Sequence, residues 1–474
     1  MRKSIHLIAI LLTLLGVMGG TARAQQIGEW QVYPSYMQAT QNVVVGSRVY
    51  SLCEGNLLYY DTEDSEVFTY DCLHNLNGVH IIHMAYSTEA HRLILVYEDS
   101  NIDLLDADDN VMDLSALRDK SITGKDVTAL YVEGRTAYLA TGFGFVEVDM
   151  KEAVFRNTYQ LDLAAISIAV SPEKVFLGTG NGLYTCARSE NMHQKNNWLQ
   201  HDKVTWHGLV WYDSHLLGLT WGVIYNIDIT GASNSRVSGS GTQIMKRSGD
   251  YLLWAGNSSV SYGTSLSDIT TIPHDNVWQD VSYAGSLFWA SEGERGLSAY
   301  KLDGGTMVHN QGPIQPNSPK HDLFYRMTWV GDRLLVAGGI NTVEGFYNPA
   351  TSMTFENGTW TNFQEIDPPT EYASFNQSNT SHLVQDPNDP SHHFASLHRI
   401  GLCEYRDAKC VKLYNCDNSP LQSILPAVDK YYNYVSCAGL RYDGDGNLWM
   451  LNSETDTIVR VLRPNGRWAA LYYS

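Results

Sequence analysis

The feature that most constrains this chain is an internal repeat with a period of roughly forty residues. Each unit combines a short apolar strand, a turn of small residues and a second strand with alternating side chains. The ten units begin at Val49, Leu93, Ala137, Val175, Leu216, Leu252, Leu287, Leu334, His393 and Leu448. Successive starts lie 35 to 59 residues apart, a spacing typical of the four-stranded blades of a β-propeller.

Side-chain alternation supports the strand assignment. In the segment VEVD, Val146 and Val148 are expected on one face of a strand, with Glu147 and Asp149 on the other. The chain also holds 29 Tyr and 12 Trp, whose large rings suit sheets that pack face to face. The sequence therefore predicts an all-β protein.

Ten units are too many for one ring, because a propeller usually has four to eight blades. We predict one seven-bladed β-propeller over residues 25–316 and a partial second propeller of about three blades over residues 320–474. The boundary falls in GPIQPNSP, Gly312–Pro319, which is rich in turn-forming residues. The segment Glu29–Tyr36 is expected to add an outer strand to either the seventh or the tenth blade.

The N-terminus is typical of an export signal. Arg2 and Lys3 precede an apolar stretch, and Ala22-Arg23-Ala24 has the form of a cleavage site. We predict a signal peptide over residues 1–24 and no transmembrane segment, because the apolar stretch is too short and no later window is apolar enough. The expected product is an exported protein.

Charge and cysteine content limit the partners and the metal chemistry. A formal charge of -19 argues against binding to nucleic acid or to an anionic membrane surface. Of the seven cysteines, four cluster near the C-terminus, and they allow three pairings. These four are Cys403, Cys410, Cys416 and Cys437. Because no C-x-x-C pair occurs among them, disulfides or free buried thiols are favoured over zinc.

No motif predicts catalysis, a metal or a cofactor. The glycines of LGTGNG, Leu177–Gly182, are expected in a hairpin turn, since no helix follows to bind phosphate. His80 and His83 would face opposite sides of a strand, which separates them as metal ligands. The adjacent His392 and His393 are expected in a solvated loop.

The carboxylates from Asp443 to Glu454 have the spacing of a calcium loop, with Asp445 and Asn447 between them. Leu448 stands where such a loop needs glycine, and an apolar strand follows instead of a helix. A sharp turn is the favoured interpretation of this segment.

Tryptophans are the best candidates for ligand contacts. Trp206, Trp211 and Trp221 fall in one unit, while Trp278 and Trp289 fall in another. Exposed rings would suit a glycan, but each ring is expected first to pack between blades. The sequence therefore does not identify the ligand-binding residues.

Several long segments together resemble one family. They are IGEWQVYPSYMQAT, YEDSNIDLLDADDNVMDL, SITGKDVTALYVEGRTAYLATGFGFVEVDM, LVQDPNDPSHHFASLHRIGLCEYRDAKCVKLYNCDNSPLQS and GLRYDGDGNLWMLN. In this order they resemble PorZ, a component of the type IX secretion system. The resemblance implies two seven-bladed propellers and a C-terminal β-sandwich, and action at the cell surface with the sortase of that system. Since the chain ends at Ser474, three units into the second ring, we expect a shortened relative or a fragment.

The resemblance implies a non-enzymatic accessory protein of type IX secretion that binds anionic lipopolysaccharide or a sortase partner through propeller loops. Two alternatives belong to other classes. The first is a periplasmic sensor propeller related to those of two-component regulators, which normally continue into a membrane helix and a kinase. The second is a propeller enzyme, which would need two carboxylates converging on the channel.

Overall fold

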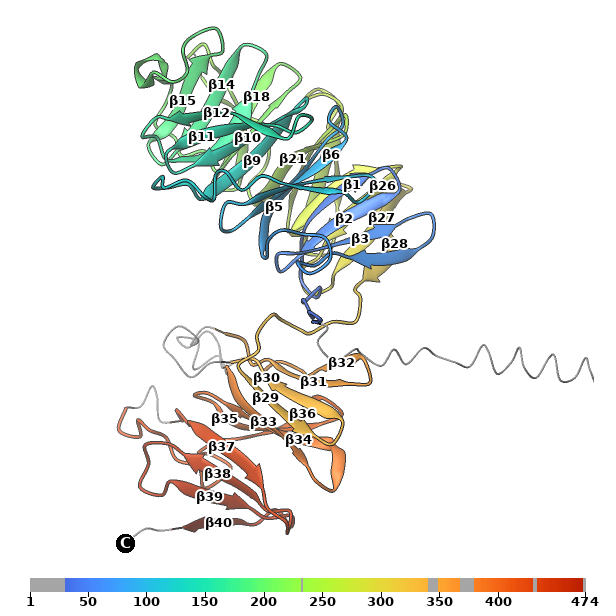
Figure 1. Ribbon diagram of the computed structural model, residues 1–474, viewed down its shortest axis with the longest axis vertical. Coiled ribbons are helices and arrows are strands. Elements are labelled where there is room, and N and C mark those ends of the chain that lie inside the picture. Colours follow the sequence, from blue (N-terminus) through green and yellow to red (C-terminus); the bar gives the residue numbers. More distant parts are fainter. Residues whose placement is uncertain (1–29, 232, 340–347, 367–378, 429–432, 472–474) are drawn as a thin grey trace, which may run out of the picture. The chain divides into compact units, whose positions relative to one another are not determined.

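The computed structural model describes residues 30–474 except 232, 340–347, 367–378, 429–432 and 472–474. Within these residues the chain forms forty strands in ten four-stranded sheets, with one short 3-10 turn, η1 (Lys195–Asn197), as the helical element (Figure 1). The prediction of an all-β propeller chain is confirmed. The predicted signal peptide lies outside the described residues.

The sheets are numbered here in chain order, and the strands of each sheet pair in sequence order. Sheet one contains β1 (Ala39–Val45), β2 (Arg48–Cys53), β3 (Asn56–Asp61) and β4 (Glu66–Thr69). Sheet two contains β5 (Ile81–Ser87), β6 (Arg92–Tyr97), β7 (Ile102–Asp106) and β8 (Val111–Asp113). Sheet three contains β9 (Val127–Glu133), β10 (Thr136–Thr141), β11 (Gly144–Asp149) and β12 (Val154–Gln160).

Sheet four contains β13 (Ala165–Val170), β14 (Lys174–Thr179), β15 (Gly182–Ala187) and β16 (Leu199–Gln200). Sheet five contains β17 (Gly208–Tyr212), β18 (His215–Thr220), β19 (Val223–Ile227) and β20 (Ser235–Arg236). Sheet six contains β21 (Thr242–Ser248), β22 (Tyr251–Gly256), β23 (Ser259–Gly263) and β24 (Thr270–Pro273). Sheet seven contains β25 (Asp280–Ala284), β26 (Leu287–Ser291), β27 (Leu297–Asp303) and β28 (Thr306–Ile314).

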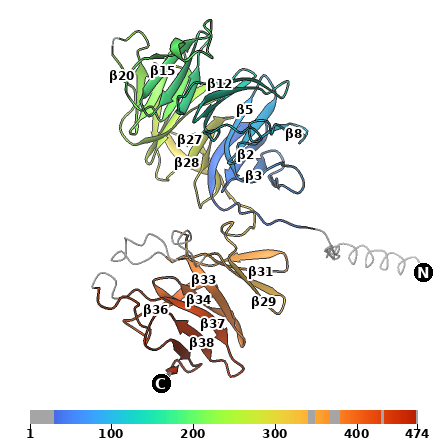
Figure 2. The ribbon, with the colours of Figure 1, turned by 60° about the vertical axis from the view of Figure 1, so that its left-hand side comes forward.

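Sheet eight contains β29 (Arg326–Val330), β30 (Arg333–Ala337), β31 (Ser352–Glu356) and β32 (Thr359–Asn362). Sheet nine contains β33 (Thr380–Asp386), β34 (Asp389–Leu397), β35 (Gly401–Arg406) and β36 (Lys409–Tyr414). Sheet ten contains β37 (Cys437–Tyr442), β38 (Leu448–Asn452), β39 (Val459–Leu462) and β40 (Trp468–Leu471). Figure 2 shows these strands from a second direction.

The hydrophobic cores lie between neighbouring sheets, as alternating strands require. In β11, Phe145 packs in the core shared with sheet four, whereas Val146 and Val148 pack in the core shared with sheet two. Asp149 is fully buried and pairs with Arg135 and Arg156. Both faces of the sheet are therefore covered, which explains why every residue of β11 is buried.

Contacts between inner strands run in a circuit through sheets one to seven. The strands β5, β9, β13, β17, β21 and β25 contact one another in order, and β1 contacts both β5 and β25. Asn42 of β1 joins the two ends, because its backbone N–H donates to Asp280 at 2.9 Å and its side chain donates to Ser291 at 2.9 Å. This circuit fits the predicted ring, while the domain limits 25–316 and 320–474 stay predictions.

The expectation that Glu29–Tyr36 supplies an outer strand is wrong for the residues described there. Residues 30–36 form no strand, and sheet seven obtains its outer strand from β28, which follows β27 directly. The segment instead makes contacts with sheet eight, where the ring of Tyr33 lies 4.9 Å from that of Phe355. A complete four-stranded sheet seven leaves no position for an added outer strand.

Sheets eight, nine and ten also contact one another in chain order through β30, β33 and β37. One core lies between sheets eight and nine and includes Leu335, Ala395 and Tyr405. A second core between sheets nine and ten includes Phe394 and Met450. Three further units are therefore present after the first seven.

Candidate functional site

The four C-terminal cysteines lie as two neighbouring pairs, and all are free thiols in the structure. The Sγ atoms of Cys403 in β35 and Cys410 in β36 are 2.9 Å apart. Cys416 and Cys437 pack in the core between sheets nine and ten. Cys403 lowers the pKa of Cys410 to about 7, and burial raises the pKa of Cys437 to about 12. Of the three possible pairings, this arrangement favours Cys403 with Cys410.

The histidines named from the sequence form no metal centre, and the described part of the chain contains no cluster of three His, Cys, Asp or Glu suited to a metal ion. His83 lies in β5, while His80 precedes the strand and has a left-handed backbone conformation, with φ of 60°. The expectation of a solvated loop for His392 and His393 is wrong, because both are buried in β34. Ion pairs of His392 with Asp386 at 3.0 Å and Glu404 at 2.9 Å offset the cost of burying its charge.

The segment after β37 has the expected turn. The Oδ1 atom of Asp443 accepts hydrogen bonds from the backbone N–H groups of Asp445 at 3.0 Å and Asn447 at 2.8 Å. Its Oδ2 atom accepts one from the indole of Trp449 at 2.7 Å. These hydrogen bonds lower the pKa of Asp443 to about 2, and the bond from Trp449 has the largest effect. The carboxylate of Asp443 therefore stabilises the turn and the strand that follows it.

Most of the named tryptophans pack inside the protein. Trp206 and Trp278 are 1% exposed and Trp289 is 2% exposed, as expected for rings between sheets. Trp221 differs, because 85% of it is exposed. It occupies the first position of the two-residue turn that joins β18 to β19, beside Gly222.

The backbone of Trp221 is in the left-handed region, with φ of 46°, and Gly222 follows with φ of 76°. Two successive positive φ values define the hairpin turn in which Asn-Gly is strongly preferred. A bulky residue in such a position costs on the order of 1–3 kcal/mol. The ring contacts His207 edge-on at 5.4 Å and has little other cover. A strained, exposed tryptophan at a hairpin tip is the strongest candidate for contact with a partner on the first seven sheets.

The space enclosed by the inner strands is crossed by an ion pair. Arg247 of β21 and Glu133 of β9 are 2.6 Å apart, although sheets three and six are not neighbours in the circuit. The hydroxyl of Tyr131 in β9 also donates to the carbonyl of Trp211 in β17 at 3.4 Å. A ligand that entered the channel here would have to break these contacts, so the loops are the better candidates for binding.

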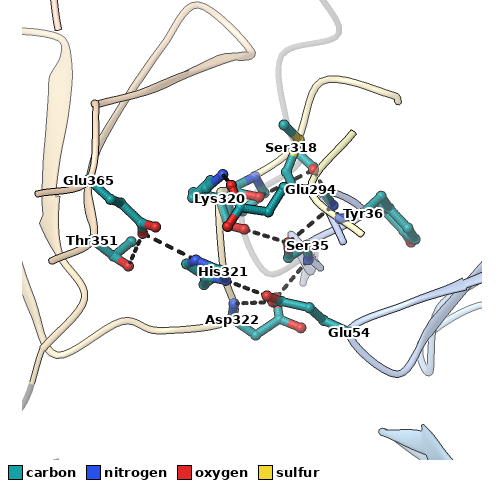
Figure 3. Close-up of polar contacts among 12 residues, drawn as sticks. Ser35, Tyr36, Glu54, Glu294, Ser318, Lys320, His321, Asp322, Thr351 and Glu365 are labelled. Atoms are coloured by element: carbon teal, nitrogen blue, oxygen red, sulfur yellow. Dashed lines mark hydrogen bonds and ion pairs between the residues drawn. The ribbon is translucent and has the colours of Figure 1, made fainter. Parts of the chain in front are cut away.

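A polar cluster lies where the chain leaves sheet seven and enters sheet eight (Figure 3). His321 is at its centre, and its side chain is 8% exposed. The Nδ1 atom contacts Glu54, which stands in the turn between β2 and β3, and the Nε2 atom lies 3.1 Å from Glu365, which follows β32. Burial by itself lowers the pKa of His321, but the two carboxylates outweigh it and raise the pKa to about 9.

Further hydrogen bonds fix the chain around His321. Asp322 accepts bonds from the backbone N–H of Ser35 at 2.6 Å and from the amide of Asn56 at 2.7 Å. Lys320 pairs with Glu294 at 2.9 Å (Figure 3). Residues far apart in sequence thus hold this connecting segment, a role that no local motif indicates.

A pocket between sheets eight and nine was not predicted. It has a volume of about 570 Å³ and is lined by Arg333, Thr354, Glu356, Thr359, Thr361, Phe363, Pro390, Ser391, His393, Asp407 and Ala408. The sequence does contain a signal for it, because threonines alternate with apolar residues in SMTFENGTWTN, Ser352–Asn362. That alternation shows one polar face, but the sheet that faces it comes from more distant sequence.

The chain contains no helix, in the part that the structure describes, with the length and apolarity needed to cross a membrane. A comparison with curated proteins returned no match.

Residues 49–199, from β2 to β16, match the family "TSS9, PorZ, N-terminal beta-propeller domain". Among solved structures, a similar one is PorZ, described as an essential bacterial surface component of the type-IX secretion system of human oral-microbiomic Porphyromonas gingivalis. The TM-score is 0.80 at 20% identity, over 94% of this chain and 60% of that one. The extracellular domain of a hybrid two-component system from B. thetaiotaomicron has a TM-score of 0.43 at 11% identity, over 92% of this chain and 65% of that one.

The chain spans 60% of the length of the PorZ structure that it matches. That structural similarity shows the fold, and the family match covers residues 49–199, which lie in sheets one to four. The chain is therefore PorZ-like.

Proposed function

We propose that this protein is a non-enzymatic accessory component of type IX secretion. The observation that carries the proposal is the match of residues 49–199 to the PorZ N-terminal propeller domain. The TM-score of 0.80 with a PorZ structure supports it at the level of the fold. The PorZ match favours this role over that of a sensor propeller.

The proposed organisation follows from that role. Residues 1–24 would direct export, residues 25–316 would form the seven-bladed ring and residues 320–474 would form part of a second propeller. The location would be the periplasm or the outer-membrane cell surface. The charge of -19 makes a broad anionic contact unfavourable, so an acidic partner would be bound by a few residues.

The proposed binding surface is the tip of the β18–β19 hairpin, with Trp221 as its anchor. Exposed aromatic rings supply much of the binding energy where proteins meet partners, and their flat faces also suit sugar rings. The strained backbone of Trp221 favours a functional role, since Asn would fit the same turn better. The partner would be anionic lipopolysaccharide or the sortase of the secretion system.

The test is a binding assay with purified Gln25–Ser474. The wild-type chain should bind lipopolysaccharide in vesicles or capture the sortase from solubilised envelope. The variant Trp221→Asn keeps a favoured turn residue and should weaken that binding by about tenfold or more. Trp329, which is 63% exposed in β29, provides the matched control as Trp329→Thr.

The vesicle assay and the sortase-capture assay distinguish the two candidate partners. Loss of vesicle binding alone identifies lipopolysaccharide, whereas loss of sortase capture alone identifies the protein partner. If the wild-type chain binds neither, or if Trp329→Thr weakens binding as much as Trp221→Asn, the proposed surface is wrong.

A further inference from the structure

One wall of the pocket between sheets eight and nine is polar, which is unusual where two sheets adjoin. In the β31–β32 hairpin, Thr354 pairs with Thr361 and Glu356 pairs with Thr359, so these four residues share one face. The opposite face carries Met353 and Trp360, which pack in an apolar cluster. Facing sheets in this fold usually bury apolar side chains, yet here a polar face lines the space beside sheet nine.

The threonines of this wall have hydroxyls that other protein groups do not occupy, and those of Thr359 and Thr361 are exposed and so open to solvent or a ligand. Across the described residues, the hydroxyls of Thr354, Thr359 and Thr361 make no side-chain hydrogen bond, and each can both donate and accept. His393 lines the same pocket and is 3% exposed. Neither of its ring nitrogens meets the geometry of a hydrogen bond, although the backbone of Ser391 lies near enough to raise its pKa, and an unbonded buried imidazole is costly.

The charges of the pocket favour an uncharged ligand. Arg333 is held by Glu356 at 2.8 Å and donates to the carbonyl of Pro390 at 2.6 Å. Asp407 adds a second carboxylate to the lining. Burial lowers the pKa of His393 to about 4, so the ring is neutral at pH 7. With one cation, Arg333, and two carboxylates, Glu356 and Asp407, the lining has a net negative charge that would repel an anionic ligand.

Shape and chemistry together restrict the ligand class. The volume of about 570 Å³ falls among those of small-molecule sites, which range from about 300 to 1,000 Å³. Phe363 provides an apolar surface and lies edge-on to His393 at 4.9 Å. Hydroxyl groups around an apolar patch complement a molecule with several hydroxyls and a C–H face.

We propose that this pocket binds a neutral hexose unit of a glycan. The threonine hydroxyls would exchange hydrogen bonds with the sugar hydroxyls, and the C–H face of the ring would lie toward Phe363. The proposal rests on sheets eight and nine and does not depend on the secretion role inferred from sheets one to four.

The probes are the methyl glycosides of glucose, galactose and mannose, tested with the mature chain by saturation-transfer NMR and calorimetry. At least one of them should bind, and glucuronate should bind more weakly than the neutral glucoside. The double variant T359V/T361V keeps the side-chain shape but removes two hydroxyls. Its affinity should fall about fivefold or more, at roughly two- to tenfold for each lost hydrogen bond.

The matched control is Thr328→Val, an exposed position in β29 outside the pocket. It should bind the same glycoside with unchanged affinity. Absence of binding by all three glycosides would overturn the proposal. So would stronger binding of glucuronate, or wild-type affinity in the folded T359V/T361V variant.

Discussion

At the residue scale, the clearest coupling of charge to structure is at His321. Five titratable or charged groups surround the connecting segment: Glu54, Glu294, Lys320, Asp322 and Glu365. His321 contacts the first and the last of these, so its positive charge is stabilised by carboxylates from two different parts of the chain. Protonation of one side chain therefore supports the contact between sheet one and the region after β32.

We predict that this support is lost at high pH. The pKa of His321 rises from 6.5 to about 9 on folding, so the stabilisation is complete below pH 6.5 and disappears as pH rises through 9. The loss should be about 2 kcal/mol after allowance for solvent screening. Denaturant unfolding at pH 6.5 and pH 9.5 measures it.

The variant His321→Gln is the control for that measurement. It retains hydrogen-bonding groups but cannot carry the charge, so its stability should change less between the two pH values than that of the wild type. An equal change in both proteins would show that other groups cause the pH dependence.

At the element scale, the β35–β36 hairpin brings two thiols together. Cys403 and Cys410 lie on paired strands, with a bulge after Glu404 that offsets the register. The lowered pKa of Cys410, caused mainly by Cys403, favours its thiolate near neutral pH. A disulfide within this hairpin is consequently favoured over the other two pairings.

We predict that oxidation with glutathione disulfide joins Cys403 to Cys410. Non-reducing peptide mapping should recover this link first, while the variant Cys410→Ser should lose it. Cys186 is buried in sheet four and serves as an unreactive control. Recovery of a Cys403–Cys437 or Cys403–Cys416 link as the main product would contradict the predicted pairing.

Element positions were largely predictable, because each repeat unit combines a period-two pattern with a turn signal. Leu177–Gly182 is an example, since Gly182 has φ of 127° and follows the β14 strand as expected. The burial of His392 was not predictable in the same way. Its partners Asp386 and Glu404 lie on neighbouring strands, and a polar sequence such as DPNDPSHH does not show how strands pair.

At the scale of the whole molecule, the count of ten units was predictable because each one forms a separate sheet. A ring of seven was predicted, but the contacts that close it were not, since Asn42 meets Asp280 and Ser291 across more than two hundred residues. The pocket beside β31 was missed, and Trp221 could not be singled out from the other candidate tryptophans, for a related reason. Both depend on which side chains remain uncovered after the sheets pack.

The proposed role in secretion belongs to the molecule as a whole, and a gene deletion in the source bacterium tests it most directly. Surface cargo of the type IX system would be measured in the deletion strain and after return of the wild-type or Trp221→Asn gene. We predict that cargo accumulates in the periplasm without the protein, that the wild-type gene restores export and that the variant restores less. Normal cargo export in the deletion strain would contradict the proposed function.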